Sequence, residues 1–327
     1  MTRFNFLLAF SLLLIASCKT AATKESAESE QKFNNPVEFN SDSAYSYIAS
    51  QVAFGPRVPG SEAHSACADY IISRLNGADS IIVQKCSAKN FRGESLPLTN
   101  IMGRFNLGAT RRILLVAHWD TRPWADNDND KNNHATPIDG ANDGGSGVGV
   151  LLELARLFGE KMPAVGVDML FVDGEDSGDS SNMIENNDDT WCLGTQYWVN
   201  HTPYSPDNLP AYGILLDMVG GRNARFYREY ASELNASAIN SKVWAMANAS
   251  GYGDRFINTV RGAVNDDHIH INKAGIPTID IIECGNSTTG SFPPTWHTLQ
   301  DNMDNIDTAT LKAVGQTVAN TIYLEKN

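Results

Sequence analysis

The sequence is poor in basic residues and in cysteine. Its 327 residues include 25 Lys and Arg against 38 Asp and Glu, which gives a formal net charge of -13. Because no basic stripe is available to neutralise phosphates, we expect no nucleic acid partner. The five cysteines form no C-x-x-C pair, so a zinc knuckle or a thioredoxin-like redox site is disfavoured. The apolar run at residues 4–15 is too short to span a bilayer comfortably.

The first 18 residues have the layout of a secretory signal. Arg3 precedes the apolar run, and small residues and Cys18 follow it. The tetrapeptide Ile15-Ala16-Ser17-Cys18 also resembles the bacterial lipobox, whose cysteine is lipidated and becomes the new N-terminus. We therefore expect residues 1–17 to be a lipoprotein signal peptide, with a plain secretory signal as the alternative.

The chain after Cys18 is polar and has no apolar period up to residue 35. We expect residues 18–35 to be a flexible tether and residues 36–327 to form the folded domain. The protein would then be a cell-envelope lipoprotein, periplasmic or anchored in the outer membrane, that touches the membrane only through its lipid. The other four cysteines are an even set in a compartment that permits disulfides, as buried thiols or as bridges of undetermined pairing: Cys67, Cys86, Cys192 and Cys284.

Beyond the tether, helical and strand-like patterns alternate. Helical periodicity is found at 41–53, 61–76, 145–160, 236–249 and 308–323, and strand-like apolar runs at 80–86, 98–105, 111–120, 165–176, 211–221 and 274–285. The last three runs are continuous, as in strands that are covered on both faces. The pattern predicts a single α/β domain, with a mixed, mostly parallel sheet flanked by helices.

Polar residues follow several of the predicted strands. Open α/β sheets carry their sites at the carboxyl ends of strands, where these residues lie: His118, Asp120, Glu175, Asp176, Asp217, Trp296 and His297. Asp143 stands just before the glycine-rich start of a helix, where it is either a ligand or only a helix cap. A dinucleotide loop is disfavoured because the glycines do not follow G-x-G-x-x-G.

Carboxylates and an imidazole at one sheet edge make a mixed N/O ligand set that suits Zn²⁺. Three protein ligands leave one position for substrate, and a carboxylate that does not bind the metal can serve as a base. Adjacent residues at a strand end can point in different directions. Glu175 could therefore face the substrate while Asp176 binds the metal.

Several segments resemble the zinc aminopeptidase-fold (M28-like) family that includes the glutaminyl cyclases, and most closely its bacterial cyclase branch. They are "LLVAHWDTRPWAD", "PIDGANDGGSGVGVLLELAR", "LFVDGED", "VNDDHI" and "FPPTWHT". The similarity runs from about Phe39 to the C-terminus. "HWDTRPWAD" is the most discriminating segment, because "GED" and "GAND" are shared with the peptidases of the fold.

The resemblance implies one zinc per chain, held by Asp143, Asp176 and His297, with Glu175 as the general acid and base. It also implies two acids near the substrate amine and three aromatic walls of the substrate pocket: Asp217 and Asp266, and Trp296, Phe292 and Trp191. Two residues depart from the animal cyclases. Asp176 stands where they have Glu, and Asp280 where they have His.

The implied activity is that of a glutaminyl-peptide cyclotransferase, an acyltransferase that converts the N-terminal glutamine of peptides and proteins to pyroglutamate and releases ammonia. One alternative is a two-zinc aminopeptidase, which would add His118 and Asp217 as ligands beside a bridging Asp143. A non-catalytic lipoprotein binding module is disfavoured, because loss of chemistry should have eroded at least one residue of the set Asp143, Glu175, Asp176 and His297.

The acidic stretch 126–134, "DNDNDKNNH", begins like a calcium loop. Lys131 stands where an EF-hand needs glycine and Pro137 where it needs glutamate, so we expect a solvated loop near the mouth of the site. No partner pattern accompanies His64, His134 or His201, which we expect at the surface.

Lipidation of Cys18 is testable on the full chain expressed in a bacterial host that processes lipoproteins. We expect the mature protein to sediment with membranes and its N-terminal peptide to begin at a diacylated Cys18, whereas a Cys18→Ala variant should not be lipidated. Mass spectrometry of that peptide is the measurement. Unlipidated protein that still carries the residues before Cys18 would refute the prediction.

Overall fold

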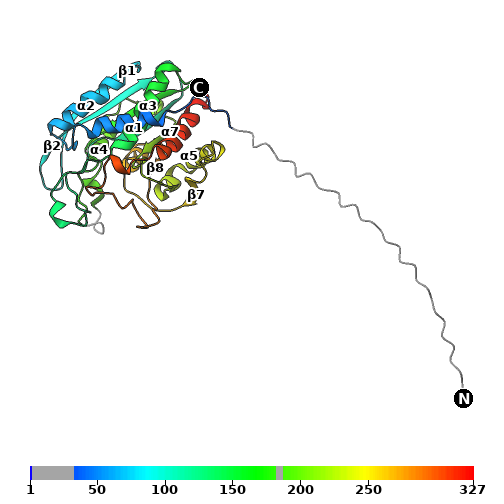
Figure 1. Cartoon of the computed structure of the whole chain (residues 1–327). Coiled ribbons are helices and arrows are strands. Elements are labelled where there is room, and N and C mark those ends of the chain that lie inside the picture. The colour runs from blue at the N-terminus through cyan, green and yellow to red at the C-terminus, as the bar shows by residue number, and fades with distance from the viewer. Residues whose placement is uncertain (2–32, 182–186) are drawn as a thin grey trace. The chain divides into compact units, whose positions relative to one another are not determined.

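A six-stranded mixed sheet forms the centre of the computed structural model, which describes Met1, residues 33–181 and residues 187–327. The strands lie in the order β1, β2, β4, β3, β5 and β8. Figure 1 labels β1, β2 and β8 of this sheet. Their bounds are Ser80–Lys89, Ser95–Phe105, Gly166–Val172, Arg112–His118, Tyr212–Leu216 and Thr278–Ile281. β1, β2 and β4 pair antiparallel, and the pairs from β4 through β3 and β5 to β8 are parallel. The predicted mixed α/β sheet is confirmed.

Residues 33–327 form one compact unit. The expected signal peptide, Cys18 and nearly all of the expected tether lie outside the described residues. Within the described part, none of the helices combines the length and the apolar character needed to cross a bilayer.

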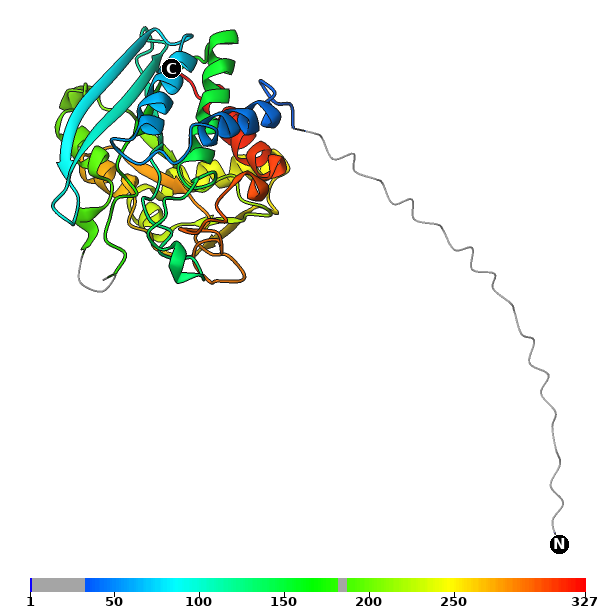
Figure 2. The same ribbon diagram turned by 60° about the vertical axis from the view of Figure 1, so that its left-hand side comes forward.

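Helices cover both faces of the sheet. The larger layer contains α1 (Ser41–Val52), α2 (Glu62–Arg74), α3 (Gly145–Glu160), α5 (Tyr230–Ala249) and α7 (Thr308–Tyr323). The opposite face carries the short helices α4 (Leu193–Asn200) and α6 (Asp267–Lys273). Figure 2 shows the long β1–β2 pair at one edge of the sheet.

The core follows from the two-residue period of the strands. In β3, the side chains of Leu115 and Ala117 join the core under the larger helical layer, while Leu114 and Val116 join the core under α4 and α6. Every residue of β3 is buried. A strand covered on both faces carries apolar side chains on both of them, which is why residues 113–117 of β3 form a continuous apolar run.

Most helices begin at a side chain that caps free backbone N–H groups. The N-caps of α1, α2, α5 and α7 are Asn40, Ser61, Glu229 and Asp307. Helix α3 differs, because its N-cap is Gly144, which has φ +80 and no side chain to cap with. Asp143 is therefore not used as the cap of α3.

The predicted segments correspond to elements of the structure, and Gly145–Glu160 agrees at both ends. The sequence patterns missed four short elements: α4, α6, β6 (Phe226–Arg228) and β7 (Phe256–Val260), of which the last two form a separate two-stranded sheet. Short 3-10 helices lie at Lys131–Asn133, Asn187–Thr190, Pro206–Asn208 and Met303–Asn305. Among the described residues the four cysteines are free; Cys86 is partly exposed and the other three are buried.

The glycines at the start of α3 allow the helix to pack closely. A Cβ atom at Gly147 would overlap the carbonyl oxygen of Leu216 in β5 and lie 3.0 Å from the Cβ of Ala117 in β3. A Cβ atom at Gly149 would meet Ile48 of α1 and lie 2.9 Å from the carbonyl oxygen of Ala44. Gly147 therefore lets α3 pack closely on the strands that carry the polar edge of the sheet, and Gly149 lets it pack closely on α1.

Gly147→Ala tests this close packing. Alanine normally favours a helix over glycine by about 1 kcal/mol. Here we expect the variant to lose about 1–3 kcal/mol of stability, because the added methyl overlaps backbone that cannot move freely. Thermal unfolding measures the change. Gly159→Ala in the same helix is the matched control, since its Cβ meets only the Cα of Gly77 at 3.7 Å. Equal melting temperatures for the two variants would contradict the packing argument.

Candidate active site

The polar residues predicted from the sequence meet at one edge of the sheet. His118 is the last residue of β3, Asp217 follows β5, and Glu175 and Asp176 follow β4 by a short turn. A cavity of about 350 Å³ opens there. All nine predicted catalytic, metal and pocket residues line it: Asp143, Glu175, Asp176, Trp191, Asp217, Asp266, Phe292, Trp296 and His297.

Asp143, Asp176 and His297 form a group whose candidate ligand atoms all lie within 4.8 Å of one another. The Nε2 atom of His297 is 3.0 Å from Oδ1 of Asp176 and 3.7 Å from Oδ2 of Asp143. Asp176 is 1% exposed, and apart from this imidazole and the guanidinium of Arg122 at 3.8 Å its carboxylate oxygens have no partner among the described residues. Buried acceptors with so few donors, turned toward an imidazole nitrogen, fit a shared cation.

The negative charge of the cavity supports the same fit. Burial raises the pKa of Asp176, Asp217 and Asp266, each to about 6, and neighbouring carboxylates add to the rise. None of the described residues that line the cavity is Lys or Arg. A divalent cation would offset this repulsion, and the N/O donor set is one that zinc accepts.

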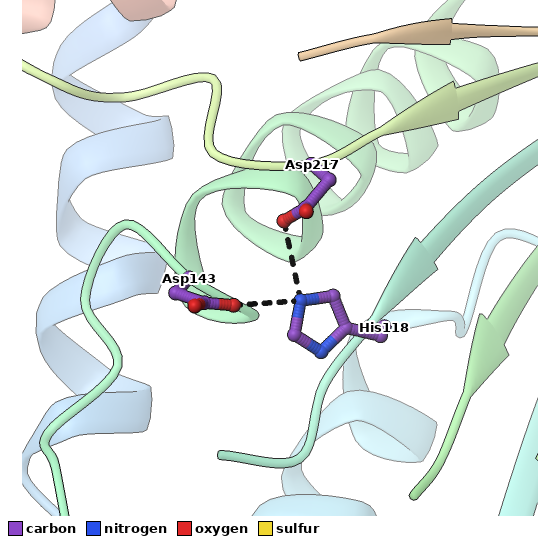
Figure 3. A group of neighbouring side chains, drawn as sticks. All are labelled: His118, Asp143 and Asp217. Atoms are coloured by element: carbon purple, nitrogen blue, oxygen red, sulfur yellow. Dashed lines mark hydrogen bonds and ion pairs between the residues drawn. The ribbon is translucent and has the colours of Figure 1, made fainter. Parts of the chain in front are cut away.

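A second group shares Asp143 with the first. The Nε2 atom of His118 is 3.1 Å from Oδ1 of Asp143 and 3.2 Å from Oδ1 of Asp217 (Figure 3). The Nδ1 atom of His118 lies 3.4 Å from Asp120. Asp143 therefore lies between two imidazoles, which is the arrangement that a bridging ligand of a two-metal site would need.

The side chains of the adjacent acids Glu175 and Asp176 point in different directions. The backbone of the turn that carries them is held by hydrogen bonds to Asp120. The carboxylate of Asp120 accepts both backbone N–H groups, at 3.1 Å and 3.2 Å. Gly174 before them has φ +66, a conformation that favours glycine. Asp176 turns to His297, whereas Glu175 turns to the other side of the cavity.

Glu175 lies among groups that do not belong to the first metal group. Its Oε1 atom is 3.6 Å from the thiol sulfur of Cys192, and a carboxylate oxygen of Asp266 lies within 4.8 Å. Burial raises the pKa of Glu175 well above its ordinary value, and the negative charge of Asp266 adds to the rise. A raised carboxyl pKa suits a group that both accepts and returns a proton.

Aromatic rings close the cavity around His297. The ring of Trp296 stacks on the imidazole with 3.7 Å between the ring centroids, and the rings of Phe292 and Trp296 have centroids 4.6 Å apart. Trp191, just before α4, lies nearly parallel to the imidazole at 6.1 Å. These rings give the acidic cavity an apolar wall.

Other residues, which no sequence motif indicated, hold the site in place. The carboxylate of Asp301 accepts the backbone N–H groups of Asn142 and Asp143, at 2.8 Å and 3.0 Å. The buried guanidinium of Arg57 donates to the carbonyl oxygens of Asp139 and Gly140 and so fixes the same loop. Arg57 lies far before Asp143 in the sequence and Asp301 far after it, so no local motif indicates either residue.

The expected surface position of His64 is wrong. This side chain is buried, its Nε2 atom is 2.8 Å from Oδ2 of Asp173, and its ring stacks on Trp119 at 4.3 Å. His134 is partly exposed and His201 is exposed. His64 was missed because its partner comes from a strand end 109 residues away.

The acidic loop 126–134 uses its carboxylates both within the loop and toward the segment that follows His297. Asp130 caps the 3-10 helix Lys131–Asn133, and Asp128 accepts the N–H groups of Asp130 and Leu299.

Asp280, which stands where the animal cyclases have His, lies close to the active site. This residue is fully buried in a group with Asp266 and His268, and neither of its carboxylate oxygens has a hydrogen-bond partner in the described part of the chain.

The fold and the cavity are those of an α/β enzyme with a candidate metal site of carboxylates and imidazoles at the carboxyl edge of its sheet. The chain belongs to peptidase family M28, whose family model matches residues 100–322.

Both cyclases and peptidases are among its relatives. The glutaminyl-peptide cyclotransferase of Bos taurus is 24% identical over 297 residues, which cover 78% of this chain and 74% of that protein. The solved glutaminyl cyclase of Bacteroides thetaiotaomicron, bound to N-acetylhistamine, is 49% identical with a TM-score of 0.85, over 90% of this chain and 100% of that one. A Zn-dependent exopeptidase of Parabacteroides distasonis is 48% identical with a TM-score of 0.85, over 88% and 99%.

Proposed function

We propose that the protein is a zinc-dependent glutaminyl-peptide cyclotransferase, which converts N-terminal glutamine to pyroglutamate with release of ammonia. The observation that carries this proposal is the position of Glu175, a buried carboxylate outside the first metal group that faces an aromatic-walled cavity. The cyclases of Bos taurus and Bacteroides thetaiotaomicron support it as relatives.

The ligands in this proposal are Asp143, Asp176 and His297. Bound there, zinc would act as a Lewis acid toward the carbonyl of the substrate's side-chain amide. Glu175 takes one proton from the substrate α-amine, whose nitrogen forms a bond to the amide carbon. The bond from that carbon to the amide nitrogen breaks, and Glu175 returns the proton to the departing nitrogen, which leaves as ammonia.

The remaining residues orient the substrate and exclude water. Asp217 and Asp266 line the cavity as acceptors for the N–H groups of the α-amine. Because the amine and the amide belong to one glutaminyl residue, holding the two groups in contact supplies much of the acceleration. The walls formed by Trp191, Phe292 and Trp296 disfavour hydrolysis, since they leave little room for a competing water.

A two-zinc aminopeptidase is the second candidate, because His118, Asp143 and Asp217 form a metal group of their own and one relative of nearly equal similarity is called an exopeptidase. A non-catalytic binding module has less support, since Asp143, Glu175, Asp176 and His297 line one cavity together.

We also propose that the enzyme works at the cell envelope, held there by a lipid on Cys18. The lipobox-like tetrapeptide and the polar residues that follow it support this location. A tether would leave the cavity free to meet the N-termini of peptides and proteins.

Glu175→Gln tests the proton transfer. Glutamine keeps the size of the side chain but cannot accept the proton, so we expect turnover of a Gln-initiated peptide to fall by about 10²–10⁴-fold. Zinc content should stay at the wild-type level, because Glu175 is outside the first metal group. Asp179→Asn is the matched control, since it removes a carboxylate from the same cavity wall. An active Glu175→Gln enzyme would sink the assignment.

The metal count and the product decide between cyclase and aminopeptidase. We expect one tightly bound zinc per chain, ammonia from Gln-initiated peptides, and little free amino acid from peptides that begin with Leu or Ala. The measurements are elemental analysis and separate assays of ammonia and free amino acids with the purified domain. Two zinc ions per chain together with released N-terminal amino acids would reverse the assignment in favour of the peptidase.

A further inference from the structure

The acidic loop at 126–128 lies against the segment that carries His297 and contacts it at three consecutive residues. Oδ1 of Asp126 lies 3.4 Å from Nδ1 of His297. The backbone N–H of Asn127 donates to the carbonyl oxygen of His297 at 3.0 Å, and Oδ2 of Asp128 accepts the N–H of Leu299 at 3.1 Å. Asp126 is not among the residues that line the cavity, so it acts on His297 from behind.

The backbone of His297 needs such support. Its φ of +55 lies in the left-handed region, which a residue with a side chain adopts only where the surroundings impose it. The centroids of the Trp296 and His297 rings lie 3.7 Å apart, but stacking on a face of the imidazole is equally compatible with the ring flipped by 180° about its Cβ–Cγ bond. A partner at Nδ1 fixes which edge of the ring faces the cavity.

Asp126 is itself fixed by Arg122, which is 1% exposed. The guanidinium binds both carboxylate oxygens, with Nε 3.1 Å from Oδ1 and Nη2 2.6 Å from Oδ2. Its Nη1 atom donates to the carbonyl oxygens of Asp176 and Gly178, at 3.0 Å and 2.8 Å. One guanidinium therefore joins the backbone at Asp176 to the carboxylate behind His297.

We propose that the Arg122–Asp126 pair positions His297 as a metal ligand, by accepting a hydrogen bond from Nδ1–H so that Nε2 faces Asp143 and Asp176. This inference rests on the proposed zinc site. A carboxylate behind a metal-binding imidazole selects the tautomer and the ring orientation. The pair also gives a role to "HWDTRPWAD", a segment for which the proposed reaction uses no side chain directly.

Asp126 is a positioning residue, because it does not line the cavity in which the substrate would react. Its loss should weaken zinc binding and leave the acid and base chemistry of Glu175 intact. Turnover of an Asp126 variant should therefore recover when zinc is added in excess, whereas turnover of Glu175→Gln should not.

Competition with a chromophoric zinc chelator measures the effect on the purified domain. We expect Asp126→Asn and Asp126→Ala to raise the zinc dissociation constant about 10–100-fold. Asp130→Asn is the matched control, since it removes the same charge from the same loop but contacts only residues of that loop. Wild-type zinc affinity in folded Asp126→Ala, or an equal loss in Asp130→Asn, would overturn the proposal.

Circular dichroism reports whether each variant is folded. If the Asp126 variants do not fold, Asp128→Ala decides, because Asp128 is a partly exposed side chain that holds the loop to the backbone N–H of Leu299. Within the loop it also accepts from the N–H of Asp130 and the side-chain amide of Asn133. It should also weaken zinc binding, and unchanged affinity there would count against the proposal. Failure of the proposed function gives a different result, since the wild-type domain would then bind no zinc or form no pyroglutamate.

Discussion

Mutual repulsion among buried carboxylates is the constraint around which this molecule is built. Asp143, Glu175, Asp176, Asp217 and Asp266 line one cavity, and His297 is the only basic side chain among the described residues that line it. A fold can keep so many like charges together only if the backbone fixes the position of each carboxylate and a cation offsets their repulsion. Much of the surrounding structure restrains the backbone at these groups. Asp120 accepts two backbone N–H groups beside the cavity, and α3 packs closely on the strands that carry the acids.

The fold was predictable where elements are long and buried. β3 and α3 could be identified from the sequence because burial on both faces gives an apolar run and a 16-residue helix repeats its pattern several times. The short helices α4 and α6 contain 8 and 7 residues, too few for a period to stand out. β6 and β7 contain 3 and 5 residues and pair only with each other in a partly exposed sheet, so little burial marks their sequences.

The site was predictable to the extent that its residues follow strands directly. Glu175, Asp176 and Asp217 stand at strand ends, so the geometry of the sheet alone brings them together. The roles of individual residues came from resemblance, and the structure shows their neighbourhood. Arg57, His64 and Asp301 act through contacts between distant segments, and no local pattern indicates such contacts. His64 therefore read as a surface residue although it is buried against Asp173.

Asp143 belongs to both metal groups, so few substitutions would separate a one-metal site from a two-metal site on this scaffold. A lineage that moves between one-metal and two-metal catalysis on this scaffold need not invent a ligand, because His118 and Asp217 already stand beside Asp143. Divergence can then proceed through substitutions around those side chains while the strands and the helix that carry them stay unchanged. Family members with different activities can therefore remain nearly superimposable.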